Sequence, residues 1–242
     1  MAEPAHLADG PSEAARPAPG ATPAARRTVL RNAAGIGAAV GAYGLSFGAA
    51  GVTAGLSTAQ TCALSLLLFT GASQFALVGV LGAGGAAVAA IAGALLLGTR
   101  NTLYAVRLGT LLPVRGPRRL LAAQLTIDET TGMATAAPEG LAGTAFWATG
   151  ASVYVLWNSA TLLGALGTAR LGDPAALGLD AAVPAAFLAL LALQVRERST
   201  LSVALSGALL AAVAIPFTPP GVPVLLAGLA VVPLILRRGR PQ

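Results

Sequence analysis

The sequence predicts an all-α protein, a polytopic membrane helical bundle of seven or eight hydrophobic segments, some of them broken. Of its 242 residues, 55% are apolar and only 10% are charged, which is too little charge to solvate the surface of a soluble domain of this size. Residues 32–99 contain no Asp, Glu, Lys or Arg. Uncharged apolar stretches of this length are typical of helices that cross a lipid bilayer.

The N-terminus is expected to lie outside the fold. Residues 1–30 are rich in Ala and Pro and lack an apolar period, so they are predicted to form a disordered tail, while residues 31–242 form the transmembrane domain. Arg26, Arg27 and Arg31 are expected to hold the N-terminus in the cytoplasm, because positive residues collect on that side of membrane proteins.

The distribution of charge and the low Cys and His content argue against nucleic-acid binding, disulfides and a Cys/His metal site. Every basic residue is arginine and the net charge is +6, but most of the arginines flank apolar segments, which indicates membrane topology rather than nucleic-acid binding. With one Cys and one His, no intrachain disulfide and no Cys/His metal site can form. No metal ion, cofactor or nucleic acid is therefore expected.

Glycines recur alternately four and three residues apart along the first segment, residues 33–54: Gly37, Gly41, Gly44, Gly48, Gly51 and Gly55. This spacing forms a glycine stripe on one helix face, where a neighbouring backbone can approach closely. Gly41, Gly44 and Gly48 are therefore expected to pack against another helix. A second interpretation stays open, in which residues 44–48 break the helix and expose backbone groups to a ligand.

The next two segments carry polar groups in apolar surroundings. The second, residues 57–81, holds Ser73 and Gln74, and a buried amide either joins helices by hydrogen bonds or contacts a substrate. The third run, residues 86–113, would be about 42 Å long as one helix, against a hydrocarbon core of about 30 Å. It is expected either to tilt or to break, with the polar residues 99–101 as the natural break point.

Three charges are expected to meet inside the bundle. Arg100 lies near the centre of the third run, where a guanidinium costs roughly 3 kcal/mol on insertion scales. Asp128 and Glu129 lie at the middle of the fourth segment, residues 120–137. We predict that Arg100 pairs with one of them. Because two carboxylates face one guanidinium, one acid is expected to be protonated or to face a cation or water.

The remaining segments determine the number of crossings. The fifth, residues 141–168, contains Trp157 and Asn158, which lie too far inside for an interfacial role alone. Three further segments, residues 181–195, 201–215 and 221–236, have almost no central polarity and are expected to act as scaffold. If all eight segments cross from a cytoplasmic N-terminus, the basic loops follow the positive-inside rule except for one cluster, Arg115, Arg118 and Arg119. A broken or re-entrant third or fourth segment would remove that conflict, so seven and eight crossings both remain open.

Several of these motifs, in this order, resemble those of AzlC-type permeases. They are residues 44–48, residues 69–75, Arg100 with Leu103 and Tyr104, Asp128 with Glu129, Trp157 with residues 162–164, residues 177–180 and residues 184–187. The resemblance runs from about residue 31 to the C-terminus. In the third-segment motif, Gly98 and Asn101 stand where the family has Asn and His.

The resemblance implies a permease subunit that exports branched-chain amino acids from a prokaryote. Such a subunit lies in the cytoplasmic (inner) membrane and works with a small AzlD-like membrane subunit. The candidate residues for substrate binding or coupling are Ser73, Gln74, Arg100, Asn101, Asp128, Glu129, Trp157 and Asn158.

A zwitterionic amino acid needs three kinds of contact, and this chain offers them all. Asp128 or Glu129 could take the ammonium, while Arg100, Ser73, Gln74 or a half-helix N-terminus could take the carboxylate. Phe69, Phe75 and leucines would receive the tail. No Walker-type ATP-binding motif is present, so coupling to protons through one of the acids is favoured.

Two alternatives come from other functional classes. A non-transporting membrane scaffold would use the glycine stripe and the buried charges only for assembly, and it would tolerate neutralisation of the charges. An intramembrane enzyme is disfavoured, because no Ser/His or paired-Asp hydrolase motif occurs, and Asp128 and Glu129 are adjacent on a helix and so point about 100° apart.

Overall fold

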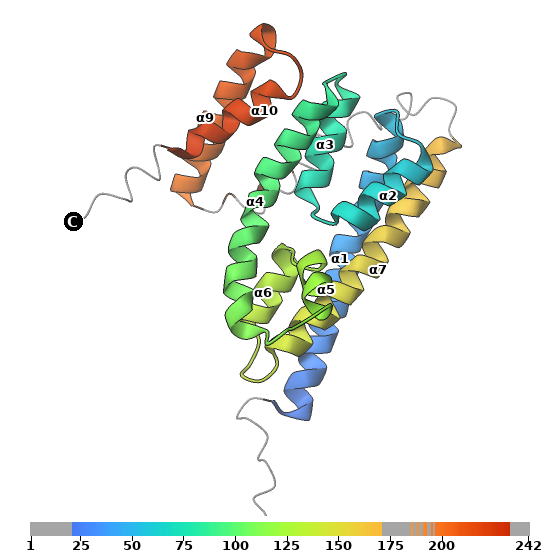
Figure 1. The fold of residues 1–242 in the computed structure, drawn as a ribbon, viewed down its shortest axis with the longest axis vertical. Coiled ribbons are helices and arrows are strands. Elements are labelled where there is room, and N and C mark those ends of the chain that lie inside the picture. The colour runs from blue at the N-terminus through green and yellow to red at the C-terminus, as the bar shows by residue number, and fades with distance from the viewer. Residues whose placement is uncertain are drawn as a thin grey trace, which may run out of the picture.

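The computed structural model describes residues 21–170 and 197–232, together with residues 185, 188, 191, 192 and 195 between them. This part of the chain is helical and contains no strand, so the predicted all-α class is confirmed. Three long helices run along the bundle: α1 (Pro23–Thr53), α4 (Ala87–Leu111) and α7 (Ala142–Ala169). Figure 1 shows α1 and α7 side by side, with α4 across from them and shorter helices in between.

The first helix begins earlier than the sequence suggested. Thr22 caps α1, and its side-chain oxygen accepts a hydrogen bond from the Ala25 backbone amide at 3.2 Å. Pro23 at the first helical position favours the same start, because its fixed φ suits a helix. Val29 is buried against Leu141 and Ala145 of the α7 region. The expected tail boundary at residue 30 is therefore wrong for residues 23–30, and residues 1–20 lie outside the described residues.

The glycine stripe of α1 packs against α7. A Cβ added to Gly41 would lie 2.6 Å from Leu156 Cβ, and Cβ atoms on Gly44 and Gly48 would overlap backbone oxygens of α7. Since α1 is one continuous helix, the expected packing role is confirmed and the alternative break at residues 44–48 is wrong. The close approach of the two backbones replaces side-chain packing along this face.

Two of the hydrophobic segments are each divided into two short helices. The second consists of α2 (Thr58–Leu68) and α3 (Ala72–Gly82), and the fourth of α5 (Arg118–Gln124) and α6 (Asp128–Ala136). We refer to residues 69–71 as the first break and to residues 125–127 as the second break. The third segment, in contrast, is the continuous helix α4, so the break expected at residues 99–101 is absent there.

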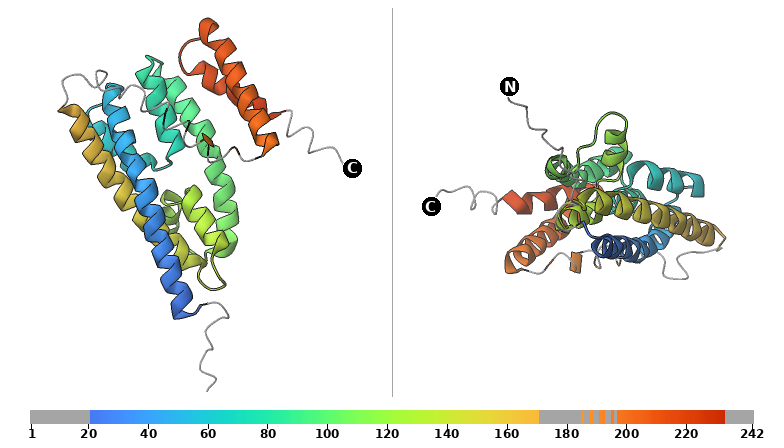
Figure 2. Two further views of the ribbon diagram at one scale, coloured as in Figure 1. Left: turned by 180° about the vertical axis from the view of Figure 1, so that it is seen from behind. Right: turned by 90° about the horizontal axis from the view of Figure 1, so that it is seen from below.

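The two pairs of short helices approach each other from opposite ends of the bundle. In Figure 1, α2 and α3 lie at the upper end and α5 and α6 at the lower end, and Figure 2 shows the same arrangement from behind. Their inner ends meet, because the Gln124 side-chain amide donates hydrogen bonds to the carbonyls of Leu66 at 2.8 Å and Leu67 at 3.3 Å. Each pair therefore turns back near the middle of the bundle.

This turning back changes the topology. The linker after α4 lies at the end of the bundle where α1 and α7 begin: Leu112 and Ala122 pack against Phe146, next to the contact of Val29 with Ala145. Arg115, Arg118 and Arg119 therefore share one end with Arg26, Arg27 and Arg31. With segments two and four turning back, at most six of the eight segments can cross, so the seven or eight crossings left open by the sequence are wrong. The conflict with the positive-inside rule disappears as well.

The C-terminal helices form a smaller layer beside α4. They are α9 (Arg198–Ala214), η3 (Ile215–Phe217), α10 (Val222–Ala227) and η4 (Gly228–Val231). α9 packs against α10 and η4, and α10 also contacts α4. Most of the predicted segment 181–195 lies outside the described residues.

The described helices fit a membrane protein. Two stretches, residues 23–53 and 200–217, are long and apolar enough to cross a membrane by length and composition. Large apolar side chains are also widely exposed, with Leu67 at 78%, Val106 at 71% and Leu120 at 75%. Such a surface suits contact with lipid or another apolar partner rather than with water.

Candidate functional site

A cavity of about 480 Å³ lies between the two breaks and the three long helices. Aromatic side chains form much of its wall: Tyr43, Phe69, Phe75, Tyr104 and Trp157. Charged side chains reach it as well, from α4 and from the start of α6: Arg100, Asp128 and Glu129. A mostly apolar cavity with a few convergent polar groups is the usual form of a small-molecule site.

Arg100 joins the two breaks. Its Nη1 atom lies 2.8 Å from Asp128 Oδ2, and its Nη2 atom donates to the Thr70 carbonyl at 3.5 Å. Thr70 belongs to the first break, and Asp128 is the first residue of α6 after the second break. The predicted ion pair is therefore confirmed, with Asp128 as the partner. Glu129 also lines the cavity but forms no salt bridge within the described residues.

The ion pair explains why α4 does not unwind at its polar centre. The side chains of Arg100 and Asp128 are 30% and 32% exposed, so the cavity relieves part of the desolvation that full burial would impose. The carboxylate and the Thr70 carbonyl supply the partners that the guanidinium lacks in an apolar segment. The acids also suit their position, because a helix N-terminus favours negative charge.

The two breaks are capped in the same way. In each, the third residue of the following helix accepts a hydrogen bond from the backbone amide just before that helix: Gln74 Oε1 from Gly71 at 3.1 Å, and Thr130 Oγ1 from Ile127 at 3.0 Å. The same side chains also donate back to carbonyls before the helix. Gln74 Nε2 reaches Leu64 and Ser65 at 3.2 and 3.3 Å, and Thr130 Oγ1 reaches Leu125 at 2.7 Å.

Both polar atoms of the Gln74 side chain therefore form hydrogen bonds that stabilise the first break. Its side chain is completely buried and does not line the cavity, and both its oxygen and its nitrogen have backbone partners. Of the two interpretations left open by the sequence, the geometry favours the joining of helices over contact with a substrate. The first break also needs glycine, because Gly71 has φ +63°, a conformation that other residues rarely adopt.

Three further candidate residues do not reach the cavity. Ser73 is buried and faces α4, where a Cβ on Gly98 would lie 3.8 Å from its hydroxyl. Asn158 donates to the Tyr154 carbonyl at 2.8 Å, one helical turn earlier. Asn101 and these two are all absent from the cavity wall. The sequence grouped Ser73, Asn101 and Asn158 with Arg100, Asp128 and Glu129 as candidate site residues. In the structure, the first three do not line the cavity.

Trp157 forms one wall of the cavity. Its ring lies 6.1 Å from that of Phe47 in a stacked arrangement and 6.2 Å from that of Phe75 in an edge arrangement. The ring is 4% exposed, and such aromatic packing fixes its orientation. Trp157 is therefore buried inside the bundle.

Sequence reasoning missed several residues of the wall, among them the three that carry a hydroxyl: Tyr43, Thr70 and Tyr104. Tyr104 was noted only as part of a motif, yet it is four residues after Arg100 and thus on the same helix face. Its side chain lies beside Asp128. Thr70 precedes Gly71 in a segment that was expected to be continuous, so nothing marked it as part of a break.

Three buried polar atoms of the wall have no hydrogen-bond partner within the described residues. They are Thr70 Oγ1, Arg100 Nε and Trp157 Nε1. Buried polar atoms are rarely left unpaired, and all three can donate a hydrogen bond. The residues of the cavity wall therefore supply buried donor atoms without partners in the described part of the chain, two carboxylates and apolar side chains.

The fold and this cavity define a helical membrane protein of the kind in which discontinuous helices meet around an internal site, as they do in many transporters. A sequence model of the family described as AzlC protein matches residues 35–171, more than half of the chain. The protein belongs to the AzlC family and has a transporter-type role. No curated protein and no solved structure matches the chain. The matched range contains the whole described cavity wall except Leu191, whereas the motifs at residues 177–180 and 184–187 lie beyond it.

Proposed function

We propose that the protein is a permease subunit that exports branched-chain amino acids through the cavity between the two breaks. The observation that carries this proposal is the combination of a guanidinium, two carboxylates and aromatic side chains in one cavity. These groups complement the three parts of such a substrate, namely the carboxylate, the ammonium and the aliphatic tail.

Each part of the substrate has a matching group. Arg100 lines the cavity and would bind the carboxylate through its guanidinium, since charge-assisted hydrogen bonds are the strong ones. Its Nε atom and Thr70 Oγ1 are fully buried and unpaired within the described residues, and they would become available as the breaks move. Glu129, which is not engaged by Arg100, would receive the ammonium. Tyr43, Phe75 and Trp157 would surround the tail, where burial of apolar area favours binding.

The opposed pairs of short helices suggest how access alternates. Because α2–α3 and α5–α6 reach the cavity from opposite ends, movement of one pair would open the cavity to one side while the other pair keeps it closed. Arg100 contacts both breaks. A substrate carboxylate that competes for Arg100 would loosen the link between them, and binding would thereby favour the change of access.

Coupling to protons is assigned to the acids. The cavity wall carries two carboxylates and one guanidinium, so without substrate it has one excess negative charge. Protonation of one acid removes this charge and would favour the change of access of the empty cavity back to the first side of the membrane. Glu129 is the acid without a salt bridge in the described residues and is therefore our choice. On the basis of family membership, we also propose the prokaryotic cytoplasmic membrane as the location and a small AzlD-like membrane subunit as the partner.

Reconstitution tests the proposal. The protein in proteoliposomes, with and without an AzlD-like subunit, should exchange labelled Leu, Ile or Val in counterflow, and a proton gradient should drive uphill export. Glu129→Gln should lose uphill export but leave some exchange at weaker affinity, because the amide oxygen still accepts a hydrogen bond from the ammonium, and Asp128→Asn should impair both. Glu139→Gln, a change in an exposed acid on the loop before α7, is the matched control and should behave like the parent.

Two outcomes would contradict the proposal. The first is a parent flux that ignores the proton gradient, which would leave Glu129 as a plain ligand for the ammonium. The second is the absence of counterflow with every partner and amino acid tested. In that case, unchanged assembly of a complex after neutralising Arg100, Asp128 and Glu129 together would favour the scaffold alternative.

A further inference from the structure

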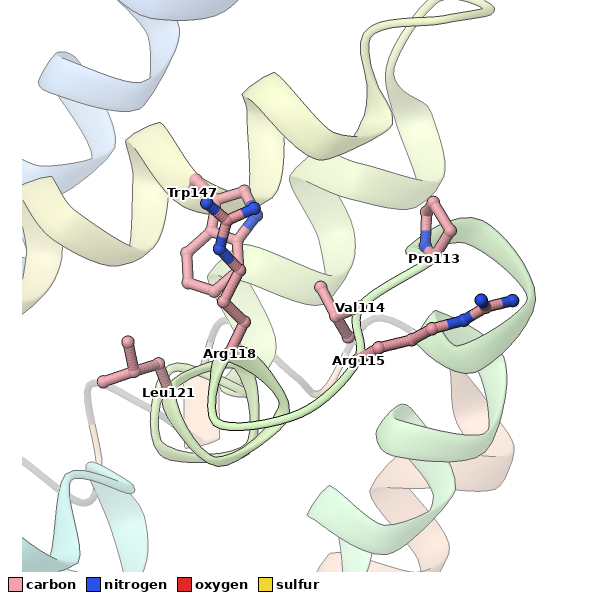
Figure 3. A pocket seen from close by; sticks show the side chains of 6 residues that line it. All are labelled: Pro113, Val114, Arg115, Arg118, Leu121 and Trp147. Atoms are coloured by element: carbon pink, nitrogen blue, oxygen red, sulfur yellow. The ribbon is translucent and has the colours of Figure 1, made fainter.

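A second cavity lies far from the first, at the end of the bundle where α1 and α7 begin. It has a volume of about 660 Å³ and is lined by Pro113, Val114, Arg115, Arg118, Leu121 and Trp147 (Figure 3). A neighbouring cavity of about 400 Å³ shares Pro113, Val114 and Arg115 and adds Arg119. None of these residues belongs to the substrate cavity.

The charge at this place is positive and unbalanced. Arg115, Arg118 and Arg119, the arginine cluster, lie within five residues of one another and have no ion-pair partner among the described residues. Residues 101–127 contain no Asp or Glu. The next acids along the chain are Asp128, which pairs with Arg100, and Glu129, and both line the substrate cavity instead. In Figure 3 the side chain of Arg115 extends away from Arg118 and Trp147, and Arg119 lines the neighbouring cavity. Three arginines on one short stretch, without ion-pair partners in the described part of the chain, still make this surface positive and attract anions, and guanidinium groups suit phosphate oxygens in particular.

The surface beside the arginine cluster is apolar rather than polar. Leu120 and Leu121 of α5 are 75% and 60% exposed, and Val106 of α4 is 71% exposed. Trp147 contributes an amphipathic ring to the cavity wall and packs edge-on against Phe146 at 5.2 Å. Tryptophan is typical of the level at which headgroups meet hydrocarbon. A soluble anion would use only the arginines, whereas a molecule with an anionic head and apolar chains would use the whole surface.

The position in the bundle fits the same ligand. The arginine cluster shares its end with the arginines at the start of α1, because both short-helix pairs turn back. Positive residues mark the cytoplasmic side, where anionic lipids attract juxtamembrane arginines.

From these observations we propose that the arginine cluster and Trp147 bind the phosphate of an anionic phospholipid, with its acyl chains along the exposed leucines of α5. The site is separate from the substrate cavity, so this inference does not depend on the transport proposal.

Fluorescence of Trp147 tests the inference. The chain has two tryptophans, so Trp157→Phe leaves Trp147 as the only reporter. In vesicles of phosphatidylcholine that contain a small fraction of brominated lipid, brominated phosphatidylglycerol should quench Trp147 several-fold more than brominated phosphatidylcholine. Arginines near the surface attract anionic lipid, so Arg115→Gln, Arg118→Gln and Arg119→Gln combined should remove most of the difference.

The matched control carries Arg26→Gln, Arg27→Gln and Arg31→Gln, three exposed arginines at the same end of the bundle. It should keep the preference of the parent, and circular dichroism should show equal helix content in all variants. Equal quenching by both brominated lipids, a preference that survives in the cluster variant, or a preference lost equally in the control would each overturn the inference. Loss of the preference on adding inorganic phosphate, but not chloride of equal ionic strength, would also overturn it, because it would identify a soluble anion as the ligand.

Discussion

The two breaks share one hydrogen-bond pattern but differ in chemistry. In both, the third residue of the following helix caps the backbone before it. The first break, residues 69–71, has no charged residue and relies on a left-handed glycine and a buried amide. The second break, residues 125–127, leads directly into Asp128 and Glu129 and relies on a threonine hydroxyl.

In both breaks, the side chains that stabilise the backbone differ from the groups that line the cavity. The capping side chains, Gln74 and Thr130, are completely buried and lie outside the cavity wall. The groups that the breaks offer to the cavity are different in kind: a carbonyl and a hydroxyl at Thr70, and carboxylates at the start of α6. A common architecture thus provides donors from one end of the bundle and acids from the other, with Arg100 between them.

Gly48→Leu should have the largest effect, because it disrupts the packing of α1 against α7, the two long helices beside both breaks. A side chain at Gly48 would overlap the α7 backbone at Thr161 and Ala165, and the two helices could not keep their contact. The yield of folded protein in detergent should fall sharply, as measured by size-exclusion chromatography. Gly35→Leu is the matched control, because no atom lies within 4 Å of a Cβ added there. Equal yields for the two variants would remove the packing argument.

Gln74→Ala should destabilise the protein by about 3 kcal/mol, since it leaves one buried amide and two carbonyls without their partner. Chemical unfolding in detergent, followed by circular dichroism, measures the change. If the variant instead unfolds like the parent, the first break is not held by Gln74 and the pattern shared by the breaks is coincidental.

Thr130→Val should cost less, about 1 to 2 kcal/mol, because valine keeps the shape of the side chain and only one amide and one carbonyl lose their partner. The same unfolding measurement applies. A loss of stability as large as that of Gln74→Ala would mean that the second break depends on its capping side chain as strongly as the first does. This result would contradict the expectation that the Gln74 cap contributes more than the Thr130 cap.

Part of this site could be predicted from the sequence. The pairing of Arg100 with Asp128 or Glu129 was predicted correctly, because isolated charges in apolar segments have few possible partners, but the sequence did not choose between the two acids. The glycine stripe was assigned correctly to packing because its spacing alone defines one helix face. Both conclusions depend on a strong local signal in the chain.

The breaks were harder to predict. Residues 57–81 have the length of an ordinary membrane span, and the bonds from Gln74 to Leu64 and Ser65 that hold the first break leave no mark on composition. The polar residues 99–101 suggested a break in α4, but the salt bridge to Asp128 satisfies Arg100 without unwinding the helix. Where polar groups find partners on other helices, the sequence of one segment cannot reveal its continuity.

The central claim is that Arg100 and Asp128 stabilise each other between the two breaks, and a double-mutant cycle tests it most directly. Arg100→Gln and Asp128→Asn, singly and combined, would be compared by unfolding in detergent. Each single variant should lose about 2 to 3 kcal/mol because it leaves the other charge without its partner, and the double variant should recover part of that loss, with a coupling energy of about 1 to 3 kcal/mol. Losses that simply add, within about 0.5 kcal/mol, would contradict the account.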